Sequence, residues 1–291
     1  MSQSVLGLDI GGSTSRARLR DGDASVVDAD GPGANVAVLD SNVVGRRLGA
    51  LVGKLGKIHP AACCAGAAGA EVPAGRARLE EILARLLPDC RVSIVHDARL
   101  VLAAASVDSG IALIAGTGSV AYGRSPDGRE LQRGGWGWMV GDDGGGVWIT
   151  RKAAREVMRR ADSGEPPGPL GEALLKAAGA GDTHQLTSAL HAMNEPMQWA
   201  ALASVVFDTA ESDAGSTDII RRAARDLASL VRDVQADLPV DGAVVLAGGL
   251  LLHQPRLEQA VREELGDTPC IRLEDPPVQG AVRLAEGLLQ A

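Results

Sequence analysis

Three short apolar runs in this 291-residue sequence each end in a glycine-rich turn. They are residues 5–9 before Gly11-Gly12-Ser13-Thr14, residues 111–115 before Gly116-Thr117-Gly118-Ser119, and residues 243–247 before Gly248-Gly249-Leu250. Apolar runs of this length are typical of buried strands. A glycine-rich turn presents backbone N–H groups without Cβ obstruction, and such concavities bind phosphate. One turn of this kind would indicate an ordinary tight hairpin, but its repetition favours nucleotide binding.

Two aspartates stand where predicted strands end. Asp9 stands just before the first turn, with only Ile10 between them, and a carboxylate there can hold a divalent cation, because hard cations prefer oxygen ligands. Asp97 follows the β-branched run 91–96 at the start of a predicted helix. Its position alone leaves two interpretations open: a general base at the carboxyl end of a strand, where α/β sheets place ligands, or a helix N-cap. His96, its neighbour, is assigned a structural role, since adjacent strand residues face opposite ways.

The densest candidate binding segment is residues 134–148, which contain seven glycines among fifteen residues. Glycines at this density destabilise both helix and strand. We expect such a segment to be kept for close backbone approach to a ligand, with Trp136 and Asp142 as the contacting side chains. The alternative is a packed loop with solvated aspartates. Trp148, at the start of a predicted helix, is expected to lie in the core.

The elements around these turns exclude a dinucleotide-binding fold. After Gly12 the sequence alternates with period two, so the first turn closes a hairpin, whereas a dinucleotide-binding fold places a helix there. The same holds after Gly118. Helical patterns cover residues 40–57, 75–87, 98–107, 150–160, 217–238 and 257–265, and the polar residues 210–217 are predicted as a loop. The repeated hairpin predicts a duplicated α/β core with a boundary near residues 107–110.

Composition and charge exclude several classes of partner. The net charge is −8, and no block of consecutive Lys or Arg is present, which argues against nucleic acid and against an anionic membrane surface. No apolar run approaches the roughly 20 residues that span a bilayer. The four cysteines lack the spacing of a disulfide frame, and the five histidines lack that of a zinc site. We therefore expect a cytoplasmic protein with reduced thiols.

With these motifs the chain resembles the N-acetylglucosamine kinase and glucosamine kinase group (BadF/BadG/BcrA/BcrD ATPase type) of the sugar kinase, heat-shock ATPase and actin superfamily. The most specific likeness is Gly134-Gly135-Trp136-Gly137 followed by Gly141-Asp142-Asp143-Gly144, which is similar to the sugar-site block of amino-sugar kinases. The resemblance implies a two-lobed actin-like, hexokinase-like α/β fold of duplicated ribonuclease H-like domains with mixed five-stranded sheets. It implies lobes of residues 1–108 and 109–277, with a helix over about 278–291 that packs back on the first.

The resemblance also implies the site. ATP and Mg²⁺ are expected, with the phosphates at Gly11, Gly12, Ser13, Thr14, Gly116, Thr117, Gly118 and Ser119, the adenosine at Gly248, Gly249 and Leu250, and Mg²⁺ near Asp9. The sugar contacts are expected to be Asn35, Asp97, Thr117, Gly135, Trp136 and Asp142. Asp97 resembles the catalytic base that activates the C6 hydroxyl of N-acetylglucosamine or glucosamine, and homodimers are common in the group.

Other functions in the superfamily stay as alternatives. One is an ATPase that activates a radical acyl-CoA dehydratase or reductase through an iron–sulfur cluster. It needs cysteines after the second phosphate motif, where this chain has Cys270 alone. Another is a non-enzymatic sugar-sensing regulator, which needs a helix-turn-helix segment and a basic face.

Overall fold

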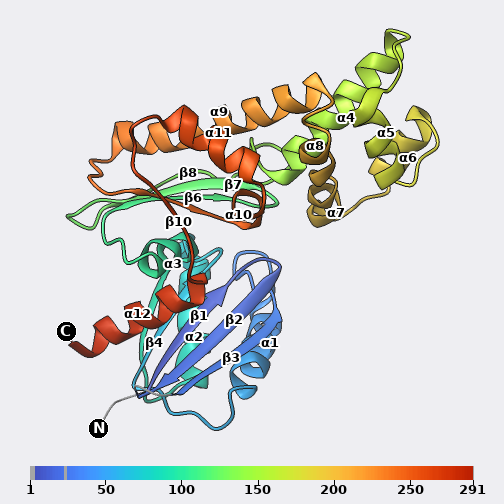
Figure 1. Cartoon of the computed structure of the whole chain (residues 1–291). Helices are drawn as coiled ribbons and strands as arrows, with labels where there is room; N and C mark the ends of the chain where they lie inside the picture. Colours follow the sequence, from blue (N-terminus) through green and yellow to red (C-terminus); the bar gives the residue numbers. More distant parts are fainter. Residues whose placement is uncertain (1–3, 23–24, 291) are drawn as a thin grey trace. The chain divides into compact units, whose positions relative to one another are not determined.

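The computed structural model describes residues 4–22 and 25–290, which fold into two compact units (Figure 1). The first unit takes the chain up to Asp108 and again from Leu273 onward, and the second takes Ser109–Arg272. Each unit has its own five-stranded sheet and hydrophobic core. The C-terminal segment therefore belongs to the same unit as the N-terminal strands.

The sheet of the first unit has the strand order β3-β2-β1-β4-β5. Its strands are β1 (Val5–Ile10), β2 (Thr14–Asp21), β3 (Ser25–Pro32), β4 (Ala62–Ala67) and β5 (Arg91–His96). β1, β2 and β3 pair antiparallel, while β4 and β5 continue from β1 in parallel. The carboxyl ends of β1, β4 and β5 therefore meet at one end of the sheet.

The strands of the first sheet differ in how deeply they are buried. β1 is buried except for half-buried Asp9, and all six residues of β4 are buried. In β2, Ser15, Ala17 and Leu19 are buried and alternate with more exposed residues. This period-two pattern, with β1 and β2 paired around the Gly-Gly turn, confirms the predicted hairpin.

Helices cover both faces of the first sheet. They are α1 (Ser41–Gly53), α2 (Pro73–Leu86), α3 (Asp97–Ala104) and α12 (Pro277–Gln290). α1 and α2 cover one face, where Leu48 and Leu83 pack with Leu8. α3 and α12 cover the other, where Leu100 and Val282 pack with Cys64. The result is a three-layer arrangement with the sheet in the middle.

The sheet of the second unit has the order β10-β9-β6-β7-β8. Its strands are β6 (Gly110–Ala115), β7 (Ser119–Arg124), β8 (Glu130–Gly134), β9 (Val244–Ala247) and β10 (Cys270–Arg272). Again three strands pair antiparallel, and two more continue in parallel from the first of them. The two sheets share one topology, which confirms the predicted duplicated α/β architecture.

Helices of very different length build the rest of the second unit. They are α4 (Gly146–Asp162), α5 (Gly168–Ala177), α6 (Thr183–His191), α7 (Pro196–Ala201), α8 (Ser204–Asp208), α9 (Ala214–Asp237), α10 (Gly249–His253) and α11 (Pro255–Leu265). α9 packs on β6, β7 and β8 with α11 beside it, and the helices α5–α8 gather around α4 (Figure 1). Trp148 on α4 is 5% exposed and lies in this core, as predicted.

The predicted loop over residues 210–217 is wrong in its second half, because α9 already begins at Ala214. Asp213 caps the helix by accepting a hydrogen bond from Gly215 N–H. Ser216 is fully buried, and its hydroxyl lies 2.7 Å from Thr209 Oγ1. The polar residues that indicated a loop are therefore cap and buried hydrogen-bonding groups. Among the residues that the structure describes, no helix has the length and apolar character to cross a membrane.

Candidate active site

The first glycine-rich turn joins β1 to β2 and is open on its outer side. Gly11 N–H donates to Thr14 O at 3.0 Å and closes the turn. Gly12, Ser13 and Thr14 are exposed. Within residues 4–22 and 25–290, no hydrogen bond uses the N–H groups of Gly12 and Ser13 or the hydroxyls of Ser13 and Thr14. The turn therefore presents backbone and hydroxyl donors that an anion such as phosphate can accept.

Asp9 and Asp97 lie at the carboxyl end of the parallel strands in the same unit. Asp9 pairs in register with Gly66 of β4, whose next residue pairs with His96 at the end of β5. Burial and, second to it, repulsion by Asp97 raise the pKa of Asp9 to about 6, while Arg16 acts to lower it. Two carboxylates that repel each other at the strand ends form a site that favours a cation.

Asp97 starts α3 and is held by the backbone. Its Oδ1 accepts a hydrogen bond from Ala98 N–H at 2.8 Å and lies 3.0 Å from His96 Nδ1. The N-cap of α3 is His96, whose Nδ1 accepts from the same N–H at 3.1 Å, so the N-cap interpretation of Asp97 is wrong by one residue. The Asp97 side chain remains 36% exposed and can reach a ligand.

Backbone hydrogen bonds of the two neighbouring residues hold Asn35 beside the first turn. Ala34 N–H donates to Gly11 O at 3.1 Å, and Val36 N–H donates to Ala68 O, just beyond β4, at 3.4 Å. The Asn35 side-chain carbonyl accepts from Ala37 N–H at 2.8 Å. Its amide NH₂ makes no hydrogen bond within the described part of the chain, so it is a donor for a ligand.

The second glycine-rich turn joins β6 to β7 and is tied to the start of α4. Gly146 N–H donates to Gly116 O at 2.8 Å, and Val147 N–H donates to Thr117 O at 3.1 Å. The Ser119 hydroxyl donates to Asp143 O at 2.7 Å, which fixes the segment that follows Trp136. The turn and the glycine-rich segment 134–146 therefore form one connected unit, although they are separate in sequence.

Asp142 packs directly on this turn. A Cβ added at Gly118 would overlap the Asp142 carboxylate, so this close approach requires glycine. Asp142 has a φ of +59°, a conformation that is uncommon for a non-glycine residue. Burial raises the pKa of its carboxyl, while the N–H groups of Gly137 and Ser119 lower it by hydrogen bonding. Asp142 is thus a constrained, half-buried acceptor.

Trp136 and Asp142 line the same cavity of about 400 Å³. Asp143 and Arg133 also line it, as does Asp226 from α9. The Trp136 side chain is 78% exposed, which leaves its ring free to stack on a sugar. Gly135, which precedes Trp136, has a φ of +72° and turns the chain there. Its N–H donates to Ser119 O at 2.9 Å.

The third glycine-rich motif lies next to the second turn. Gly248 follows β9 with a φ of +90°, and a Cβ there would overlap Ala115 O. Gly249 starts α10, and its N–H group lies 3.9 Å from where a Cβ of Gly116 would stand. Leu250 follows in the first turn of α10. This arrangement brings the predicted adenosine and phosphate motifs of the second unit together.

The predicted site residues thus form two groups, one in each unit. The first unit brings together Asp9, Asn35, Asp97 and the turn 11–14. The second brings together the turn 116–119, Gly135, Trp136, Asp142 and the motif 248–250.

Two site residues were missed from the sequence. Arg16 stands opposite Asp9 in the hairpin and lowers its pKa. Counting register outward from the Gly-Gly turn could have found it. Asp226 lines the cavity with Trp136, and burial raises its pKa, with Asp143 as the second cause. It lies on α9, far from the loop in sequence, so no local pattern indicates it.

The repeated topology and its glycine-rich hairpin turns define an actin-like, hexokinase-like ATPase fold. A hexokinase of the ROK group from Thermus thermophilus shares this fold with a TM-score of 0.57 and 19% identity over 99% of this chain and 100% of that one. The sequence profile of the BadF/BadG/BcrA/BcrD ATPase family matches residues 6–283, so the chain belongs to that family.

Two further proteins are similar to this chain. A structure described as a candidate N-acetylglucosamine kinase from Chromobacterium violaceum has a TM-score of 0.76 and 26% identity, covering 98% of this chain and 99% of that one. An N-acetylmuramic acid/N-acetylglucosamine kinase from Clostridium acetobutylicum is 34% identical over 167 residues, which are 54% of each chain. The match therefore spans about half of that curated relative.

Proposed function

We propose that this protein is an ATP-dependent amino-sugar kinase that phosphorylates the C6 hydroxyl of N-acetylglucosamine or glucosamine. The observation that carries the proposal is the position of Asp97. It is a part-exposed carboxylate at the carboxyl end of β5, in electrostatic reach of Asp9 and in the same unit as the open turn 11–14. A proton acceptor near a phosphate-binding turn is the arrangement that phosphoryl transfer to an alcohol requires.

Asp97 is assigned the role of general base. It accepts the proton of the C6 hydroxyl as the hydroxyl oxygen bonds to the γ-phosphorus and the bond from that phosphorus to the β–γ bridging oxygen breaks, releasing ADP. The hydrogen bond from Ala98 N–H holds its Oδ1 in place. Because the transition state of phosphoryl transfer is loose, positioning and charge stabilisation supply most of the catalysis. The base itself typically contributes about 10²–10⁴ in rate.

The ATP phosphates are assigned to the two glycine-rich turns. In the first, the donors at residues 12–14 have no protein partner among the described residues. In the second, the turn adjoins Gly249, which supports placing the adenosine at Gly248, Gly249 and Leu250. Backbone N–H groups suit this role because their positions are set by the fold before ATP binds.

Mg²⁺ is assigned to Asp9, directly or through water. Asp9 fits because its carboxylate is partly buried and is repelled by Asp97, a setting in which a cation relieves both the cost of burial and the repulsion. Within the described residues, no cluster of three or more acidic, His or Cys side chains forms a metal cage. This agrees with a cation that binds one or two carboxylates together with substrate phosphates. When bound, Mg²⁺ neutralises the phosphate charge.

The sugar contacts are assigned to individual side chains and one glycine. Trp136 offers an exposed ring for stacking, and Asp142 offers a fixed carboxylate for hydroxyl groups. Asn35 contributes its amide donor, and Thr117 and Gly135 complete the proposed contacts. The names of the two similar kinases support an amino sugar as the substrate class.

A coupled ADP-release assay on the purified chain tests this function. N-acetylglucosamine, glucosamine, N-acetylmannosamine, a muramic acid and glucose are compared at equal concentration, with a sugar-free reaction as the control. We expect sugar-dependent turnover to be highest with N-acetylglucosamine or glucosamine, and NMR of the product to place the phosphate on C6. ADP release that no sugar stimulates would contradict the proposal.

A further inference from the structure

Basic side chains gather on α4 and α9, and none of them is assigned to ATP or sugar. Two cavities of about 470 and 530 Å³ lie along these helices and share Lys152, Asp218 and Arg222. Seven of the 29 Lys and Arg residues of the chain line the two cavities, against three acidic residues. A chain with a net charge of −8 therefore carries a local positive excess here. We call this feature the basic trough.

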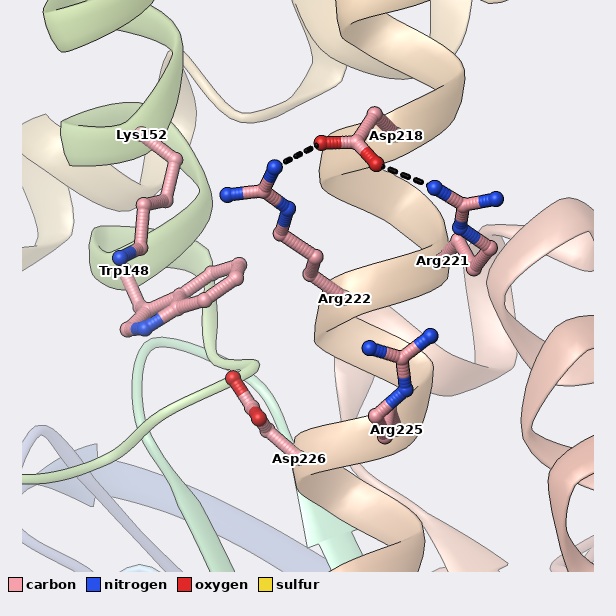
Figure 2. A pocket seen from close by; sticks show the side chains of 7 residues that line it. All are labelled: Trp148, Lys152, Asp218, Arg221, Arg222, Arg225 and Asp226. Atoms are coloured by element: carbon pink, nitrogen blue, oxygen red, sulfur yellow. Dashed lines mark hydrogen bonds and ion pairs between the residues drawn. The ribbon is translucent and has the colours of Figure 1, made fainter.

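The cations of the trough converge from opposite sides. Figure 2 shows Lys152 and Trp148 on α4 facing Arg222 and Asp218 on α9, with Arg225 one turn further along α9. The Lys152 Nζ lies 4.8 Å from the centre of the Trp148 ring. Because Trp148 is 5% exposed and fixed in the core, this cation–π contact holds the ammonium group at the trough.

The carboxylates of the trough do not balance these cations. Asp218 is shared by two arginines, with Arg221 at 2.5 Å and Arg222 at 2.6 Å. Arg225 reaches Glu264 only at 4.0 Å. Within the part of the chain that the structure describes, Lys152 and Arg155 form no ion pair.

Glu156 pairs with Arg159 and Arg160, which leaves Asp226 as the third carboxylate of the trough. Burial raises the pKa of Asp226, and Asp143 raises it further, while Lys152, Arg225 and Arg222 lower it. Like charges that face one another without counter-charges destabilise a fold, and an anion that enters removes the repulsion. Guanidinium groups bind phosphate oxygens in pairs through parallel N–H donors, and an ammonium group adds a point charge. The cavity volumes lie in the range of small-molecule sites.

We propose that the basic trough binds a small phosphorylated molecule, a phosphomonoester or a diphosphate, through Lys152, Arg155, Arg222 and Arg225. Phosphate is favoured over a monocarboxylate because several cations converge on one ligand and a phosphate group carries close to two negative charges. The proposal does not depend on the kinase activity, since none of these residues is assigned to catalysis.

Calorimetric titration of the full chain tests the site, with pyrophosphate, glucose 6-phosphate and citrate as probes at constant ionic strength. We expect one of the two phosphate compounds to bind more tightly than citrate at the same ionic strength. In a separate salt series, the affinity for that compound should fall as the salt concentration rises. The variants are Lys152→Met, which keeps a long side chain over Trp148, and Arg155→Gln, an exposed residue whose change cannot disrupt the core. Each should weaken binding about tenfold or more, as expected for loss of a charged hydrogen bond.

Two control variants change residues that do not line the trough. Arg78→Gln, on α2, removes an arginine that bonds to Ala74 O of its own helix and should leave binding unchanged. Asp97→Asn should also leave it unchanged, whether or not the chain is a kinase. Equal affinity of the trough variants and the wild type, citrate binding as tightly as the phosphates, or no binding at millimolar probe would each overturn the proposal.

Discussion

The carboxylate of Asp142 rests on the backbone of Gly118, so closely that a methyl group at position 118 would occupy the place of its oxygen. The contact joins a phosphate-type turn to the segment that presents Trp136. Asp142 cannot easily retreat, because its φ of +59° and the N–H of Gly137 at 3.2 Å hold it in place. The two motifs therefore move only together.

Gly118→Ala should damage activity more than folding. The added Cβ displaces Asp142, and overpacking of this kind typically costs about 1–3 kcal/mol. We expect kcat/KM for the sugar to fall by about tenfold or more, as measured by ADP release. The matched control is Gly45→Ala on α1, where a Cβ would meet open space. If the Gly118 variant keeps wild-type kcat/KM, the proposed coupling of the two motifs is incorrect.

Asp97→Asn should remove most of kcat while ATP binding stays nearly intact. Asparagine keeps an oxygen for the Ala98 N–H but cannot accept the substrate proton. A loss of about 10²–10⁴ in kcat is expected. Calorimetry with ATP and a steady-state assay with saturating sugar measure the two effects separately. Near-wild-type turnover would refute the base assignment.

Asp9→Asn should stabilise the fold while impairing Mg²⁺-dependent turnover. Burial raises the pKa of Asp9 to about 6, so its ionised form destabilises the native state once the pH exceeds the ordinary carboxyl value. The neutral variant removes this cost, so its free energy of unfolding should exceed that of the wild type by about 1–3 kcal/mol at pH 7. The stability gain should grow from about pH 4 to about pH 6 and then stay constant. Denaturant unfolding across this range measures it, and a variant less stable than the wild type at pH 7 would argue against the charge effect.

Asp213 should stabilise the fold at neutral pH and lose this effect in acid. Burial raises the pKa of its carboxyl, but hydrogen bonds from Arg160 and from backbone N–H groups outweigh burial and hold the pKa below its usual range. Its contribution is therefore full at neutral pH and is lost as the pH falls below about 4. Asp213→Ala should cost about 2–4 kcal/mol at pH 7, because it removes the buried carboxylate that accepts two hydrogen bonds from Arg160 and also removes the α9 cap. A cost that does not shrink in acid would contradict the ion-pair account.

Trp136 should report sugar binding by fluorescence. Its side chain is 78% exposed, so a stacked sugar changes its surroundings strongly. We expect the true substrate to shift or quench the emission of the wild type, and Trp136→Phe to abolish that change. Trp138→Phe is the control and should keep the response. A fluorescence response that persists in the Trp136 variant would show that the sugar does not stack on Trp136.

Local sequence patterns predicted the elements well wherever side-chain spacing decides them. The period-two run after Gly12 predicted β2, and the period of the apolar residues predicted most of α9. The start of α9 was misplaced because Asp213 and Ser216 have the polarity of loop residues. Their hydrogen bonds are made to a helix end and to the buried Thr209, which only the packed structure supplies.

By itself the sequence determined the glycine-rich hairpins, the duplicated α/β core and the burial of Trp148, because each follows from short-range periodicity and backbone sterics. The tertiary structure decided which distant groups meet: Asp9 with Asp97 across β4, Asp142 on Gly118, and Lys152 opposite Arg222. Such pairs depend on strand order and helix packing, and the charge interactions that follow depend on distance and burial. Neither quantity can be read from spacing along the chain.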